Sequence, residues 1–116
     1  MKIAYFWMTQ KGHELTCRLQ KAMGGIIEPK AEFPKTVQRD FQDCDALVFV
    51  MAMGIVVRTI APLICSKDKD PAVIVLDQNG TFVISLLSGH LGGANYLTKR
   101  IAAAIQAQPV ITTATD

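Results

Sequence analysis

Short, nearly continuous apolar runs recur along this chain of 116 residues, and segments with helical spacing of apolar residues lie between them. The clearest runs are 2–7 (KIAYFW), 45–51 (DALVFVM) and 72–76 (AVIVL). Strands that are covered by helices on both faces have this composition, because neither face meets water. The alternation predicts an α/β fold of three layers, with a mostly parallel sheet and helices on both faces.

Turn residues place one further strand antiparallel to the others. Asn79-Gly80 follows the run 72–76 and is a strong signal of a tight hairpin, so 81–86 is predicted to return as an antiparallel strand. A last strand is predicted at 109–113 (PVITT).

Helices are predicted between these strands from the spacing of their apolar residues. Leu15, Leu19 and Met23 share one face, which predicts a helix over 13–23 after a turn at 9–12. Further helices are predicted at 36–41 and, from Leu97, Ile101 and Ile105, after residue 95.

The chain is predicted to form one domain, 1–116, because no linker or internal repeat interrupts it. The last strand is followed only by Ala-Thr-Asp, whereas strands of this class are usually followed by a covering helix. We therefore expect the N-terminal part of a longer protein, or a chain that packs on a second subunit and can form a homo-oligomer.

Composition excludes several classes of protein. Half of the residues are apolar, and 12 Lys and Arg against 10 Asp and Glu leave a net charge of +2, which argues against binding to nucleic acid through phosphates. The longest apolar run, 46–57, has 12 residues, too few to span a membrane. Cys17, Cys44 and Cys65 are widely spaced and are interpreted as buried hydrophobic residues, which favours a cytoplasmic protein without disulfides or a metal site.

The densest chemical signal is the glycine-rich loop 88–95 (SGHLGGAN), which joins a strand to a helix. Its glycines allow close approach of a ligand, and the helix N-terminus favours an anion. Ser88 adds a hydroxyl and His90 an imidazole that titrates near neutral pH. The alternative is a tight strand-to-helix turn in which Ser88 or Asn95 caps the helix.

Three other segments have one functional and one structural interpretation each. Gly54 is predicted to turn the chain after a strand, and Arg58 can then clamp a carboxylate or lie as a surface side chain. Lys67 lies in a charged loop that can bind an anion or be merely solvated. Asp77 is either a general base or the first residue of a turn.

Four strings follow one another in the chain: MGIVVRxIAPL (53–63), KxxDPAVIVLD (67–77), FVISLLSGHLGGAN (82–95) and PVITTATD (109–116). Together they resemble the N-terminal region of the CbiG family, the cobalt-precorrin-5A hydrolases of anaerobic cobalamin biosynthesis. The resemblance is close over 45–116 and weaker over the first strand and helix.

The resemblance implies a corrinoid tetrapyrrole substrate that carries its own cobalt, so that no cofactor is expected on the protein. The reaction it implies opens a δ-lactone and releases acetaldehyde, which gives cobalt-precorrin-5B. The alternative is a non-catalytic module that binds a corrinoid or another anion while the catalytic residues lie in the rest of the protein.

For this reaction we expect His90 to transfer protons. Ser88 and the amides of Gly92 and Gly93 are expected to stabilise an oxyanion, and Asp77 to orient His90 or activate water. The loop 88–95 is predicted to share a concave surface with Gly54 and Arg58. Substrate binding is expected at Gly54, Arg58, Lys67, Gly89, Gly92, Gly93 and Asn95.

Overall fold

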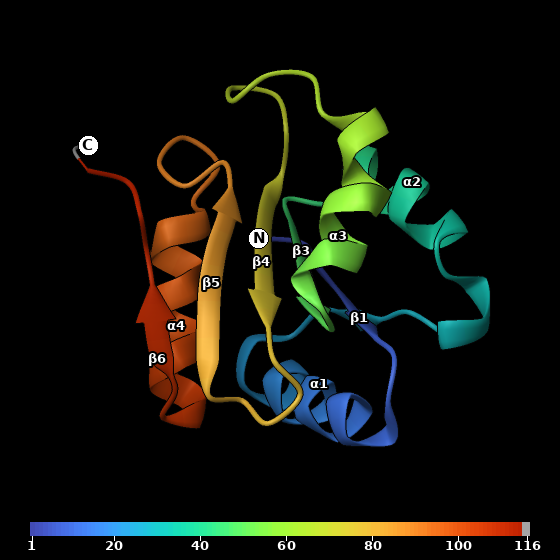
Figure 1. Ribbon diagram of the computed structural model, residues 1–116, viewed down its shortest axis with the longest axis vertical. Coiled ribbons are helices and arrows are strands. Elements are labelled where there is room, and N and C mark those ends of the chain that lie inside the picture. The colour runs from blue at the N-terminus through green and yellow to red at the C-terminus, as the bar shows by residue number, and fades with distance from the viewer. Residues whose placement is uncertain (115–116) are drawn as a thin grey trace.

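The computed structural model describes residues 1–114 and contains one six-stranded sheet in the order β2-β1-β3-β4-β5-β6 (Figure 1). Neighbouring strands are parallel except β4 and β5, which are antiparallel. This confirms the predicted mostly parallel sheet with one antiparallel hairpin strand. The strands are β1 (Ile3–Trp7), β2 (Ile26–Ile27), β3 (Ala46–Val50), β4 (Ala72–Leu76), β5 (Phe82–Leu87) and β6 (Gln108–Val110).

Helices cover both faces of the sheet, as the apolar strands require. The helices are α1 (Gln10–Met23), α2 (Lys35–Asp43), α3 (Met53–Ile60) and α4 (Ala94–Ile105), with short 3₁₀ turns η1 (Lys30–Glu32) and η2 (Ala61–Leu63). One hydrophobic cluster holds α1 and α4 against one face, and a second holds α2 and α3 against the other. The predicted three layers are therefore present.

Successive residues of the central strands enter opposite clusters. Val48 lies in the cluster beneath α1 and α4, whereas Leu47 and Phe49 lie in the cluster beneath α2 and α3. All five residues of β3 are buried, and so are all five of β4. Both faces of these strands are therefore buried against helices, as the continuous apolar runs predicted.

Three local features of the sequence prediction are wrong. The turn predicted at 9–12 is wrong: α1 begins at Gln10, because the Thr9 hydroxyl accepts a hydrogen bond from the Gly12 amide and caps the helix. The last strand ends at Val110 instead of residue 113. Gly54 does not turn the chain but lies in the first turn of α3, whose N-cap is Ala52.

The cysteines differ in their exposure. Cys44 is buried, and burial raises the pKa of its thiol to about 11, so this side chain stays neutral and packs as a small hydrophobic residue. Cys17 is half-buried and Cys65 is exposed, so the expectation of three buried cysteines is wrong.

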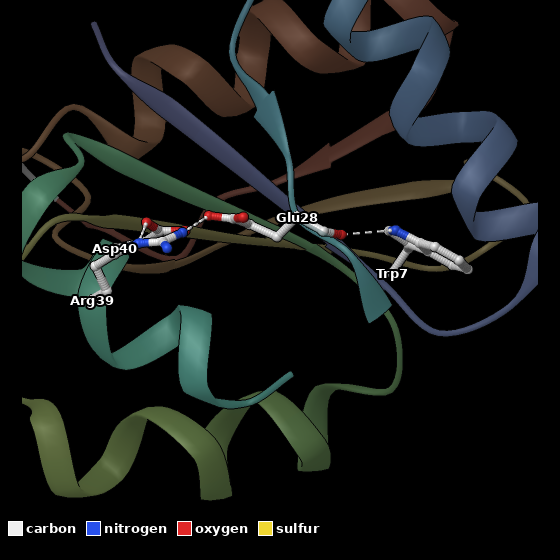
Figure 2. A network of polar contacts seen from close by, with 4 residues as sticks. All are labelled: Trp7, Glu28, Arg39 and Asp40. Atoms are coloured by element: carbon white, nitrogen blue, oxygen red, sulfur yellow. Dashed lines mark hydrogen bonds and ion pairs between the residues drawn. The ribbon is translucent and has the colours of Figure 1, made fainter. Parts of the chain in front are cut away.

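A polar network fastens the edge strand β2 and helix α2 to the rest of the sheet (Figure 2). The Trp7 indole donates a hydrogen bond of 3.0 Å to the Glu28 carbonyl. The Arg39 guanidinium pairs with the Glu28 carboxylate and, at 3.1 Å, with Asp40. Both carboxylates are buried, whereas the Arg39 side chain is 57% exposed, so the arginine closes the network from the solvent side.

The Glu28 carboxyl group is buried next to a second buried carboxyl group, that of Asp40. Burial raises the pKa of Glu28, and hydrogen bonding to Asp40 raises it further, while Arg39 opposes this shift only in part. A proton on Glu28 can be donated to Asp40, whose oxygen Oδ2 is buried and lacks a hydrogen-bond partner among the described residues.

Replacing Val48 by Asp should unfold the protein. An unpaired buried carboxylate costs several kcal/mol, against a total stability of about 5–15 kcal/mol. Val57→Asp is the matched control, because Val57 is 44% exposed on α3 and should tolerate the charge. Thermal unfolding followed by circular dichroism measures both, and a wild-type transition for Val48→Asp would contradict the assigned core.

Glu28→Gln should reduce the loss of stability between acidic and neutral pH. Because the Glu28 pKa is higher in the folded than in the unfolded chain, its contribution is full below the ordinary value of 4.5 and is lost as the pH rises through the folded-state pKa. The free energy of unfolding is measured with urea from pH 4.5 to 7. Glu14→Gln on the exposed side of α1 is the control, and an unchanged pH dependence in Glu28→Gln would contradict the buried acid pair.

Candidate functional site

The loop between β5 and α4 folds back on itself before the helix begins. Ser88 has a left-handed backbone (φ 60°), and its hydroxyl donates a hydrogen bond of 3.0 Å to the Asp70 carbonyl. The amides of Ala94 and Asn95 donate to the carbonyls of Ser88 and Gly89 at 3.1 and 2.9 Å. The first amides of α4 therefore bind loop carbonyls, which leaves them unavailable for an anion in this conformation.

Two glycines of this loop are needed because other atoms lie close to them. A Cβ atom at position 92 would lie 2.4 Å from the Cβ of Ser88. A Cβ atom at position 89 would lie 2.8 Å from Oδ1 of Asn95 and 2.9 Å from Oγ1 of Thr113. The glycines thus serve the packing of the loop itself, which is the structural interpretation that the sequence had left open.

A cavity of about 410 Å³ opens beside this loop and combines polar and apolar groups. His90 and Lys99 bring an imidazole and an ammonium group to it, and both side chains are exposed. The Asn95 oxygen Oδ1 accepts a hydrogen bond of 2.8 Å from Ser85, which fixes the amide at the wall. The lining residues are Gly89, His90, Gly93, Asn95, Tyr96, Lys99, Ile111, Thr113 and Ala114.

The loop that carries Lys67 lies at the same end of the sheet. It leads into β4, and the bond between Ser88 and Asp70 joins it to the loop before α4. The Asp70 carboxylate is buried and accepts hydrogen bonds of 3.0 Å from the Cys65 amide through both oxygens. Lys67 is exposed on this loop but is not among the residues that line the cavity.

Asp77 is not near His90. Its carboxylate accepts hydrogen bonds from the amides of Asn79, Thr81 and Phe82, at 3.2, 3.0 and 2.8 Å, and so shapes the hairpin turn. Because β5 runs antiparallel to β4, this turn and the loop before α4 lie at opposite ends of a strand about 17 Å long. The expectation that Asp77 orients His90 is therefore wrong.

Gly54 and Arg58 do not share the surface of the glycine-rich loop. They lie on α3, which packs on the opposite face of the sheet from α4. A Cβ atom at position 54 would lie 3.2 Å from the Arg58 guanidinium, so this side chain folds back over its own helix. Of the oxyanion candidates, Ser88 donates to Asp70, and the Gly93 amide donates to the His90 carbonyl at 3.3 Å.

A second cavity, of about 440 Å³, was not foreseen from the sequence. It lies where the parallel strands β1, β3 and β4 end, which is the usual place of ligand sites in α/β sheets. Its wall is mainly apolar, and only knowledge of the strand order could have placed its residues together. The lining residues are Met8, Thr9, Val50, Met51, Ala52, Met53, Ile55, Val75, Leu76, Asp77, Gln78 and Ile84.

The part of the chain that the structure describes contains no helix long and apolar enough to cross a bilayer. Within the same residues, 1–114, no three His, Cys, Asp or Glu side chains are grouped so that they could hold a metal ion.

The sheet order and the helices on both faces define a doubly wound α/β protein. The family model described as "Cobalamin synthesis G N-terminal" matches residues 35–116, and the chain belongs to this family. The fold also resembles a cobalamin biosynthesis protein G homologue from Sulfolobus solfataricus, with a TM-score of 0.81 and 24% identity over 96% of this chain and 36% of that structure.

Curated relatives bear a common name. A cobalt-precorrin-5A hydrolase from Priestia megaterium is 54% identical over 98% of this chain and 29% of its own length. The protein of that name from Salmonella typhimurium is 49% identical over 88% of this chain and 30% of its own. A protein from Methanocaldococcus jannaschii with the name "Probable cobalt-precorrin-5A hydrolase" is 34% identical over the whole chain and 36% of its own length. The chain thus spans about a third of the relatives it matches.

Gly92→Ala should distort the loop, whereas Gly54→Ala should not. The added methyl group at position 92 meets the Ser88 Cβ at 2.4 Å and its carbonyl oxygen at 2.9 Å, so the backbone must move. At position 54 the new methyl meets only the flexible end of Arg58, and alanine favours the helix by up to about 1 kcal/mol. Amide chemical shifts measure both, and unchanged shifts over 88–95 in Gly92→Ala would contradict the loop geometry.

Proposed function

We propose that this chain is the N-terminal region of a cobalt-precorrin-5A hydrolase, an enzyme of cobalamin biosynthesis. The identity of 54% with the Priestia megaterium hydrolase over 98% of the chain is the observation that carries this proposal. The substrate is a corrinoid that bears several carboxylates and holds its own cobalt, so the reaction needs no further cofactor on the protein.

The proposed reaction consumes one water and releases one acetaldehyde. Water adds to the lactone carbonyl, and the ring C–O bond breaks to give a carboxylate and a hydroxyl group. The two-carbon unit that bears this hydroxyl then leaves as acetaldehyde, while the electron pair of the broken C–C bond remains on the macrocycle. A base takes the proton of the hydroxyl group, and an acid donates a proton to the macrocycle carbon that keeps the electron pair.

The cavity beside α4 supports the binding of such a substrate. Lys99 supplies a positive charge at its wall, and Asn95 and Thr113 supply polar groups. A carboxylate of the corrinoid can pair with the Lys99 ammonium while His90, at the same wall, transfers a proton. The exposed Lys67 can meet a second carboxylate from the adjoining loop.

A second candidate function is favoured by the position of Asp77. Asp77, the carboxylate that the sequence offered as a general base, lies in the hairpin turn at the other end of β5 and does not line this cavity. This N-terminal region can then bind the substrate without catalysing the reaction. The reacting groups would lie in the part of a full-length family member that corresponds to the unmatched two thirds of the relatives.

His90→Ala should lower kcat for acetaldehyde release about 10²-fold, the usual loss when a general acid or base is removed. The assay uses residues 1–116 joined to the part of the Priestia megaterium relative that lies beyond its matched region, so that the whole length of a family member is present. If His90 only positions the loop, His90→Asn restores turnover, because the amide keeps hydrogen-bonding groups of similar shape.

The same assay separates the two candidate functions. A binding role alone predicts a higher KM with unchanged kcat in His90→Ala, whereas a catalytic role predicts a lower kcat. His13→Asn is the control, because the chain's other histidine lies on α1 and does not line the cavity. Lack of acetaldehyde release by the unsubstituted joined protein would contradict the proposed hydrolase.

A further inference from the structure

One face of β5 and β6 is mainly apolar and bears no helix. Val83 points toward α4 and is buried, so its neighbours Phe82 and Ile84 point to the other face. Leu86 lies farther along that face and packs against the cluster beneath α2 and α3. On β6, Val110 pairs with Ile84 and Gln108 pairs with Phe82, so one apolar and one polar side chain of β6 share that face. We call the three residues Phe82, Ile84 and Val110 the open sheet face.

Figure 1 shows α4 behind β5 and β6, with no helix in front of these two strands. The exposure of the side chains agrees with this view. Phe82 is 47% exposed, whereas Ile84 and Val110 are half-buried. Contiguous apolar side chains that remain accessible mark a surface that another part of a protein covers.

The open sheet face continues into the second cavity. Ile84 belongs to both, and Ile55 of α3 forms the facing wall. Among residues 1–114, the lining of this cavity contains no Lys, Arg or His. Its one acidic residue is Asp77, whose carboxylate accepts hydrogen bonds from the amides of its own turn. A corrinoid with several carboxylates finds no positive charge here, so the surface suits an apolar protein segment better than the substrate.

The lengths of the relatives indicate which protein segment covers the open sheet face. The matched family model is the N-terminal part of its proteins, and this chain spans only 29–36% of the relatives. About two thirds of such a protein therefore follow the region described here. Because β6 is the last strand of this region and Val110 pairs with Ile84, the polypeptide after β6 starts beside the open sheet face, and its described residues 111–114 then run past the loop 88–95.

We propose that the open sheet face is the docking surface for the segment that follows this region in full-length family members. Apolar side chains of that segment cover Phe82 and Ile84 and close the cavity at the ends of the parallel strands. The proposal rests on family membership and does not depend on the proposed chemistry.

The test measures protease resistance in the joined protein, in which residues 1–116 precede the remaining part of the Priestia megaterium relative. A docked segment protects the connection between the two parts from trypsin. Phe82→Glu and Ile84→Glu bury a charge on docking, so each should speed cleavage of this connection about tenfold. Ile26→Glu is the matched control, because Ile26 is 49% exposed on β2 at the opposite edge of the sheet.

Phe82→Glu decides the test if Ile84→Glu fails to fold, because the Phe82 side chain is already half exposed. Folding is checked by circular dichroism of each variant. Cleavage at the wild-type rate in a folded Phe82→Glu protein would overturn the proposal. A dimer of the 116-residue chain that Phe82→Glu dissociates in sedimentation, with cleavage of the joined protein unchanged, would assign the face to a second copy and would also overturn it.

Discussion

The Asp77 carboxylate holds the turn that reverses the chain between β4 and β5. It accepts hydrogen bonds from three amides of this turn, and Gly80 there adopts a left-handed backbone with φ 70°. Because of this reversal, β5 ends where the parallel strands begin. The loop before α4 is thereby placed beside the loop that leads into β4, and the hydroxyl of Ser88 fastens the two together.

The same reversal divides the molecule into two chemically different ends. The cavity beside α4 has Lys99 and His90 at its wall, whereas the cavity at the ends of β1, β3 and β4 is lined mainly by methionine and aliphatic side chains. A polyanion, such as the substrate proposed above, is attracted to the first end and gains little at the second. The two cavities can therefore serve different partners without competing for one surface.

Much of the fold could be predicted from the sequence, because strands buried on both faces need continuous apolar runs and tight turns need particular residues. The site could be predicted only in part. The loop 88–95 is one contiguous string, but whether Asp77, Gly54 or Arg58 approaches it depends on strand direction and on which face each helix covers. The pairing of Glu28 with Arg39 was missed because it joins separate elements without a local pattern.

Neither edge of the sheet favours pairing with a further strand, whereas the open sheet face can be covered by other apolar groups. At one edge β2 has two residues and is fastened through Glu28 to Trp7 and Arg39. At the other edge β6 has three residues and contains Pro109, which lacks an amide hydrogen for a further strand. Short edge strands and proline both discourage pairing with another chain. Apolar contact across the face of β5 and β6 is then the association that the described region favours, since it needs no further backbone hydrogen bonds and removes exposed hydrophobic surface from water.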